Sequence, residues 1–91
     1  MAFKGMDIAQ ARQLETKLQT EADRLGKLAT DLKSKVANST PHWKGPDANQ
    51  FRTKVWPEID KLLTDVQKTL VAAKGTIESQ RGQQERASAA R

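Results

Sequence analysis

The chain has 91 residues, a formal net charge of +5, 36% hydrophobic residues and no cysteine. These values allow one domain at most and exclude disulfides and thiolate metal sites. Leu, Ile, Val and Phe together make up just under a fifth of the residues, so a monomer is short of apolar side chains for a core. We expect such a chain to complete its hydrophobic interior with a partner.

The first seven residues contain no apolar stretch of the kind found in secretory signals, so we expect no cleaved signal peptide. No apolar run approaches the roughly 20 residues that a membrane-spanning helix requires. The sequence therefore predicts a soluble protein without a transmembrane segment.

A first helix is predicted over about residues 7–37, with Asp7 as its N-cap. Leu18, Leu25 and Leu32 keep a seven-residue spacing that is typical of a coiled-coil seam. Gly26 costs about 1 kcal/mol relative to Ala inside a helix, and it fits either a close helix approach or simple tolerance. Apolar residues at steps of three and four form one stripe: Ala11, Leu14, Leu18, Ala22, Leu25, Leu28, Ala29, Leu32 and Val36.

A connector follows over residues 38–47. Asn38 is suited to end the first helix in a left-handed conformation, and Pro41 disfavours helix at the residue before it. Pro46 fits the first turn of a new helix, where its missing N–H is harmless, and Asp47 complements the positive end of the helix dipole.

A second helix is predicted over about residues 46–80. Its apolar stripe repeats every eleven residues, about 3.67 per turn, which predicts a nearly straight seam. Because the apolar register runs unbroken through Pro57, we predict a kink there and no helix end. The polar residues 81–91 are predicted to form a fraying tail. The stripe consists of Ala48, Phe51, Val55, Ile59, Leu62, Val66, Leu70, Ala73 and Ile77.

Two long helices joined by a short connector predict an all-α fold, an antiparallel helical hairpin that forms a single domain over residues 1–91. Trp56, Leu63 and Val71 widen the second stripe beyond what one partner helix can cover. We therefore predict that two hairpins dimerise into a four-helix bundle. The predicted hairpin or dimer interface comprises Leu14, Leu18, Leu25, Leu28, Leu32, Phe51, Val55, Trp56, Ile59, Leu62, Val66 and Leu70.

The sequence offers little for catalysis. The single histidine, His42, lies near Ser39 and Asp47, but no strand–turn–helix elbow is present to expose a nucleophile, which favours a surface histidine. One histidine without cysteines supplies too few metal ligands. We expect a protein that is not an enzyme and uses no cofactor or metal.

The connector contains Trp43-Lys44-Gly45. Tryptophan carries the largest apolar surface of any side chain, and Gly45 gives the backbone freedom that a turn requires. Trp43 can plug the end of the hairpin and also form part of a surface that a partner recognises. Trp56, on the flank of the second helix, is interpreted as a packing residue.

With Trp43-x-Gly45 between two helices, and with Ala48, Phe51 and Trp56 following, the chain resembles the WXG family of about one hundred residues, the Esx or ESAT-like proteins of bacterial type VII secretion. The resemblance covers nearly the whole chain. It implies helical hairpins that pair into homodimeric or heterodimeric four-helix bundles. It also implies export in folded form, without a cleaved signal, by a machine driven by a membrane-bound ATPase.

In that family the Trp-x-Gly turn is one half of an export signal, whose other half is Tyr-x-x-x-Asp/Glu after the second helix. This chain has no tyrosine, and the residue four beyond Ile77 is Arg81, a cation. The resemblance thus implies that another WXG-type protein supplies the second half as a heterodimer partner. A homodimer, a tail that acts through other residues, and a member that is not exported remain alternatives.

A second hypothesis follows from the positive charge alone: a basic helical module that binds nucleic acid or an anionic membrane surface. Residues 7–37 carry mixed signs, and no stretch has five like charges in a row. That distribution favours solvated helix faces, so we expect no specific nucleic-acid partner. An acidic heterodimer partner would instead be steered and oriented by the net positive charge.

Overall fold

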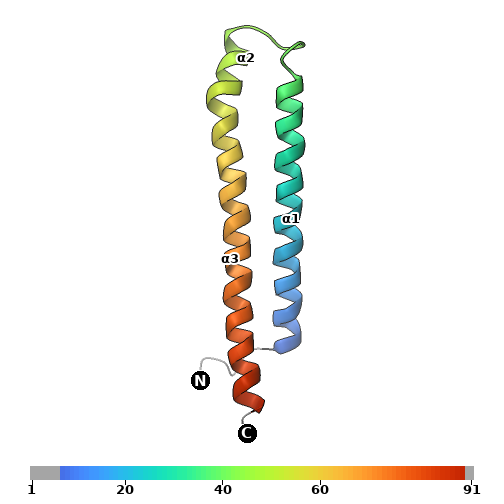
Figure 1. Ribbon diagram of the computed structural model, residues 1–91, viewed down its shortest axis with the longest axis vertical. Helices are drawn as coiled ribbons and strands as arrows, with labels where there is room; N and C mark the ends of the chain where they lie inside the picture. Colours follow the sequence, from blue (N-terminus) through green and yellow to red (C-terminus); the bar gives the residue numbers. More distant parts are fainter. Residues whose placement is uncertain (1–6, 90–91) are drawn as a thin grey trace.

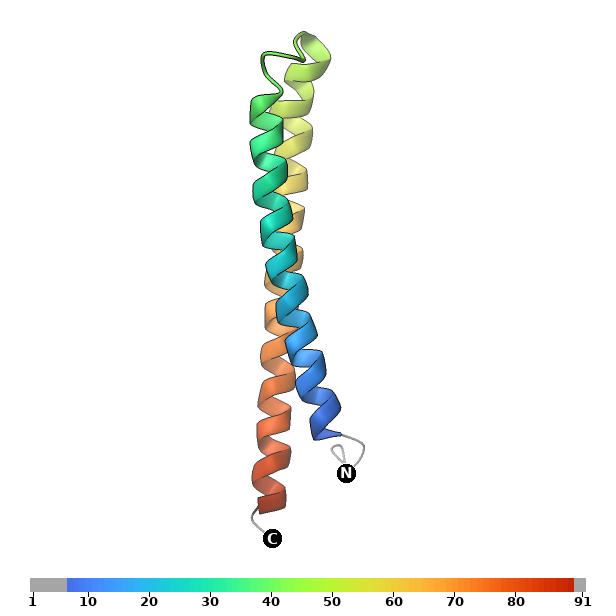
Figure 2. The same ribbon diagram turned by 90° about the vertical axis from the view of Figure 1, so that its right-hand side faces the viewer.

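The computed structural model describes residues 7–89, which form an all-α antiparallel hairpin (Figure 1). α1 (Ile8–Asn38) leads to the tip, and the chain returns through α2 (Pro46–Gln50), a π-helical turn η1 (Phe51–Val55) and α3 (Trp56–Ala89). The long helices lie side by side in Figure 1, and in the view turned by 90° they overlap and cross at a shallow angle (Figure 2); the molecule measures 69 × 17 × 15 Å. The predicted helical hairpin is confirmed.

The two ends of α1 are closed by side chains. As predicted, Asp7 is the N-cap, and its carboxylate accepts a hydrogen bond from the backbone N–H of Gln10 at 3.2 Å. The prediction that Asn38 ends the helix in a left-handed conformation is wrong, because the helix includes Asn38 and its cap is Ser39, with φ −74° and ψ −14°. The Ser39 hydroxyl donates to the Val36 carbonyl at 2.6 Å and so satisfies a helix-end acceptor without a left-handed residue.

The returning chain stays helical through Pro57. Pro46 and Asp47 occupy the first turn of α2, as predicted. As predicted, no helix ends at Pro57. Where we predicted a kink, the structure has a π-helical turn just before the proline, in which the N–H of Trp56 bonds to the carbonyl of Phe51. Proline lacks the N–H donor and its ring crowds the carbonyl four residues earlier, so a wider turn in front of it relieves the clash.

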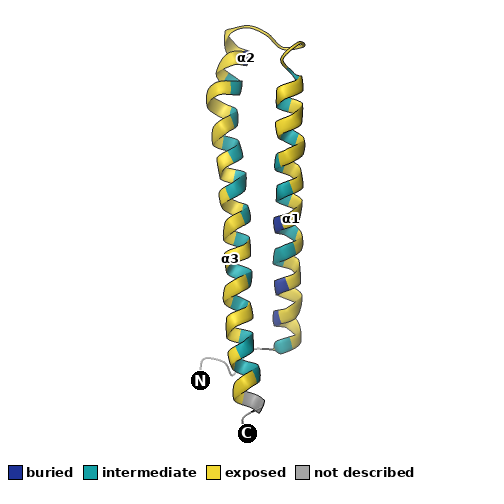
Figure 3. Ribbon diagram, in the orientation of Figure 1, coloured by how far each residue is buried: buried dark blue, intermediate teal, exposed yellow. Residues whose placement is uncertain are grey.

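The face of α1 that packs on α3 follows the predicted seven-residue pattern. Leu18, Leu25 and Leu32 are half-buried, and the half-buried residues of both long helices lie on their facing edges (Figure 3). The fully buried apolar residues among those described are small, namely Ala11, Ala22 and Ala48. The hairpin seam is therefore narrow and contains no fully buried large side chain within the described residues.

The predicted stripe of the returning chain is divided between the face that packs on α1 and an exposed side. Its buried or half-buried members are Ala48, Phe51, Ile59, Leu70, Ala73 and Ile77, and its exposed members are Val55, Leu62 and Val66. Leu62, at its centre, is 62% exposed, whereas the neighbouring Leu63 is half-buried. The inward positions of α3 follow a seven-residue repeat because α1 presents such a repeat, and paired helices that wind around each other keep this period. The half-buried residues that fit this repeat are Trp56, Asp60, Leu63, Gln67, Leu70, Lys74, Ile77 and Arg81, and they are flanked by further half-buried residues such as Ile59, Thr64 and Ala73.

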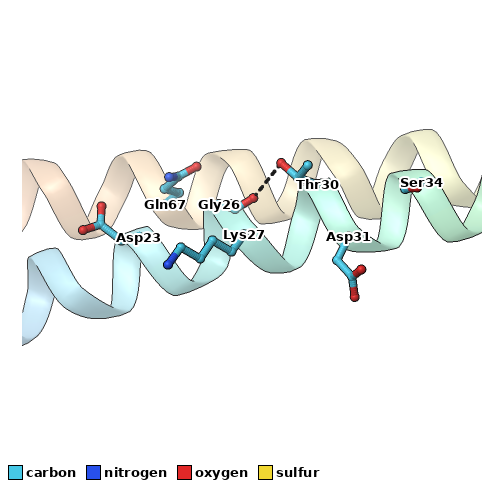
Figure 4. Close-up of a pocket in the computed structure, with 7 residues that line it drawn as sticks. All are labelled: Asp23, Gly26, Lys27, Thr30, Asp31, Ser34 and Gln67. Atoms are coloured by element: carbon cyan, nitrogen blue, oxygen red, sulfur yellow. Dashed lines mark hydrogen bonds between the residues drawn. The ribbon is translucent and has the colours of Figure 1, made fainter.

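Gly26 faces a glutamine side chain of α3. A Cβ added there would lie 2.7 Å from Nε2 of Gln67, which reaches across from α3 (Figure 4). This contact is with the end of a flexible side chain and not with the α3 backbone, so it does not distinguish a close helix approach from simple tolerance of the glycine. The surrounding surface forms an open groove lined by polar side chains, with Lys27 and Asp31 on α1 and Gln67 on α3.

The open end of the hairpin is held by ion pairs. Glu15, only 6% exposed, accepts hydrogen bonds from Nε and Nη2 of Arg81 at 2.5 and 3.1 Å, and Arg81 also pairs with Glu85. Glu85 in turn binds Arg12 of α1 at 3.0 Å. The hydrogen bond from Arg81 lowers the pKa of the Glu15 carboxyl.

These contacts correct the prediction for the tail. Instead of fraying after residue 80, α3 continues as helix to Ala89, and residues 90–91 lie outside the described part. The physical reason is that Arg81 and Glu85 are tied to Glu15 and Arg12 across the seam. Polar composition alone therefore does not mark the end of this helix.

Candidate functional site

The tip of the hairpin carries the Trp-x-Gly sequence. Trp43 is 43% exposed. Its backbone N–H donates to the Ser39 carbonyl at 2.8 Å, so the loop turns tightly after α1. Its ring lies against that of Phe51, with centroids 5.5 Å apart and planes tilted by 49°. Trp43 therefore packs on the returning chain with one side and faces solvent with the rest.

Gly45 is the N-cap of α2 and has φ 110° and ψ 178°. This backbone region is essentially restricted to glycine. A Cβ at this position would meet no atom within 4 Å, so the requirement is conformational and does not come from crowding. The glycine of Trp-x-Gly is thus explained by the turn itself.

The candidate catalytic set does not assemble. His42 is exposed, and its backbone N–H bonds to the Ser39 carbonyl. The Ser39 hydroxyl instead donates to Val36 and accepts from Arg52. Within residues 7–89, no hydrogen bond joins the side chains of His42, Ser39 and Asp47, and no group of three or more acids or histidines lies together as metal ligands.

The predicted interface residues divide into two sets. Those that contribute to the hairpin are half-buried: Leu18, Leu25, Leu32, Phe51, Trp56, Ile59 and Leu70. Those that the hairpin leaves exposed are Leu14, Leu28, Val55, Leu62 and Val66. We call the second set the apolar face.

Helix geometry places the apolar face on one broad side of the molecule. Leu14 of α1 and Ile77 of α3 line the same groove. Eleven residues make about three full turns, so Val66 and Val55 continue along the side of α3 that carries Ile77. Leu28 lies two seven-residue repeats after Leu14 and shares its flank of α1.

The opposite broad side is different. The groove there is lined by Asp23, Gly26, Lys27, Thr30, Asp31, Ser34 and Gln67, most of them polar. Val71 is exposed on α3 about 180° from Leu62, because it lies nine residues further along at about 100° per residue. The hairpin is therefore amphipathic across its width.

Sequence reasoning missed two groups of contacts. Arg52 binds the tip loop, and Glu15 binds Arg81, although all three occur in the sequence as ordinary helix-surface charges. A signal was available for the second pair, since Glu15 falls on the same stripe as Ala11, Leu18 and Ala22. A charge on an apolar stripe requires an opposite charge on the facing helix.

No family model, curated protein or solved structure matches this chain. Within the described residues, neither long helix has an apolar stretch of the length and hydropathy needed to cross a bilayer. Conclusions about function therefore depend on the tip and the apolar face.

Proposed function

We propose that this chain is a non-enzymatic substrate or co-secreted partner of a bacterial type VII (Esx-type) secretion system and that it acts as a dimer. The observation that carries the proposal is the apolar face, which a single hairpin leaves uncovered. The exposed Trp43 at the tip, followed by a glycine-specific turn at Gly45, supports it further.

The hydrophobic effect supplies the reason for pairing. The hairpin fully buries only small apolar residues among those described, while five large ones remain exposed on one side. Covering them removes apolar surface from water at about 25 cal/mol per Å². A second hairpin laid on this side would bury that surface and complete a four-helix bundle, with either a copy of this chain or another WXG-type protein as partner.

The open end supports a partner that brings the second half of the export signal. Where the family pattern would place an acid four residues after a tyrosine, this chain has Arg81, and its guanidinium is engaged with Glu15. The tip is then the half of the signal that this chain supplies to the complex that the secretion ATPase recognises. The protein would be cytoplasmic before export and would leave without a cleaved signal.

The pairing is tested with charge substitutions on the two sides of α3. Leu62→Asp or Val66→Asp should abolish the dimer, because a carboxylate buried without a partner is costly, and Val71→Asp on the opposite side should leave it intact. Light scattering across a range of concentrations, with and without the candidate partner, measures the mass. A dimer that survives both Leu62→Asp and Val66→Asp contradicts the assigned face.

The role of the tip is tested with Trp43→Ala. We expect export to fall strongly while the melting temperature of the dimer changes little, because much of the ring is exposed to solvent. Secretion assays and thermal unfolding of the same variant give the two readings. If stability and export fall equally, Trp43 has a structural role only and the proposed recognition role is contradicted.

The alternative, a basic module for nucleic acid or anionic membranes, gains no support from the charges on the surface. Lys17 and Arg24 both pair with Glu21, and Lys35 pairs with Asp31, so these three cations lie in mixed-sign clusters. Among the described residues, exposed lysines without an ion pair, such as Lys33 on α1 and Lys61 and Lys68 on α3, occur one or two at a time and form no run of like charge. Binding to nucleic acid or anionic vesicles that persists in moderate salt would favour this alternative.

A further inference from the structure

Arg52 is a cation of the returning chain that lies outside both the Trp-x-Gly sequence and the apolar face, and its side chain reaches the tip loop. Arg52, in η1, donates from Nε to the Ser39 hydroxyl at 3.2 Å and from Nη2 to the Trp43 carbonyl oxygen. Its Cζ atom lies 5.7 Å from the centroid of the Trp43 ring. One side chain therefore contacts the end of α1, the backbone of the loop and the indole.

We infer that Arg52 is a positioning residue that fixes how Trp43 is presented at the tip. The residue does not itself need to touch a partner. For its effect on partner recognition, the inference rests on the proposed function of the tip, whereas its effect on Trp43 does not.

The chemistry of the side chain fits this role. A guanidinium has donors directed at fixed angles, so it can bond two oxygens at once and still lay its plane near an aromatic ring. The distance to the Trp43 ring is within the range of a cation–π contact. A lysine ammonium keeps the charge but lacks the planar fork, so it cannot reproduce all three contacts.

Two successive residues of the returning chain hold the indole. Phe51 and Arg52 both contact Trp43. They lie in η1, the wider turn that precedes Pro57. Phe51 packs on the ring and Arg52 binds it electrostatically, so the indole is held from the returning chain while its remaining surface faces solvent.

The test uses the fluorescence of Trp43 in the full chain. Trp56→Phe leaves Trp43 as the sole tryptophan, and acrylamide quenching then reports access to its ring. Arg52→Gln should raise the quenching constant by about twofold, because a ring now 43% exposed loses its cation–π contact and its anchored carbonyl. Lys54→Gln, which removes an exposed charge two residues away, should leave the constant unchanged.

Circular dichroism of each variant checks that the hairpin remains helical. Should Arg52→Gln lower the helicity, the same comparison is made with Arg52→Lys, which keeps the charge and is expected to give an intermediate quenching constant. Quenching in the folded Arg52 variant that matches that of wild type and Lys54→Gln overturns the inference.

The functional arm compares export of Arg52→Gln, Trp43→Ala and Lys54→Gln. We expect the first two to lose export and the third to retain it. Normal export of Arg52→Gln alongside failed export of Trp43→Ala would overturn the role of Arg52 in recognition. Normal export of both would overturn the proposed function of the tip, and the fluorescence result would still decide the positioning of Trp43.

Discussion

At position 45 the backbone conformation alone requires a glycine. Its φ of 110° lies where an L side chain is strained, although a Cβ would meet no neighbour. We expect Gly45→Ala to lower the free energy of unfolding by about 1–3 kcal/mol. Gly75→Ala is the matched control, because Gly75 lies within α3 with open space around it and should gain up to about 1 kcal/mol. Urea unfolding of both variants measures the difference, and a neutral Gly45→Ala would show that the turn adopts another conformation.

For single residues, the sequence predicted those features that depend on a residue and its immediate neighbours in the chain. These features are the N-cap at Asp7, the proline in the first turn of α2 at Pro46, and the turn that requires glycine at position 45. Arg52 could not be predicted in the same way, because its three contacts depend on the three-dimensional path of a loop that begins thirteen residues earlier, at Ser39.

The pairing of Glu15 with Arg81 joins the beginning of α1 to the end of α3. Because Arg81 depresses the pKa of Glu15 in the folded state, this pair stabilises the fold above the usual pKa of a glutamate, about 4.3. That stability is lost as the pH falls through the lower folded pKa. We expect the urea midpoint to drop between pH 5 and pH 3, by less in Glu15→Gln than in wild type. Glu58→Gln, which alters an exposed carboxylate near the tip, should keep the pH dependence of wild type.

The register of α3 can be tested with two adjacent leucines. Leu63 is half-buried against α1, whereas Leu62 belongs to the apolar face. At concentrations where the chain is monomeric, Leu63→Ala should destabilise the hairpin by at least about 1 kcal/mol more than Leu62→Ala. At concentrations that favour the dimer, Leu62→Ala should also lower the stability. Equal effects in the monomer would contradict the register.

The predicted apolar stripe of the second helix is wider than the seam with α1, and this difference has a physical cause. α3 has more apolar residues than α1 can cover. The clearest repeat of apolar residues in the sequence therefore includes the exposed apolar side of α3 as well as the narrow seam with α1. Inward positions such as Gln67 and Lys74 are polar and weaken the seven-residue signal. The Lys74 ammonium bonds to Gln19 Oε1 at 3.2 Å, a partner that only the folded hairpin supplies.

The whole molecule is a thin rod whose stability should depend on concentration. If a second hairpin covers the apolar face, mass action makes the melting temperature rise with protein concentration. A tenfold increase should raise it by roughly a few degrees in wild type and leave it unchanged in Leu62→Asp. Thermal unfolding at several concentrations checks this. A melting temperature of wild type that is independent of concentration would contradict a dimer in that range.

The polar residues of the seam also set how far α3 can slide along α1. Arg81 now meets Glu15, and a slide of seven residues would place it against Ala22 or Ile8, so that it would keep only its pairing with Glu85 and leave Glu15 without its partner. The same slide in one direction would bring Lys74 towards Arg12, a like charge. An apolar seam with seven-residue spacing would tolerate such a shift with little loss. The ionic positions therefore favour the observed alignment over a slide of seven residues, and they hold the two helix ends in register on either side of the loop that carries Trp43.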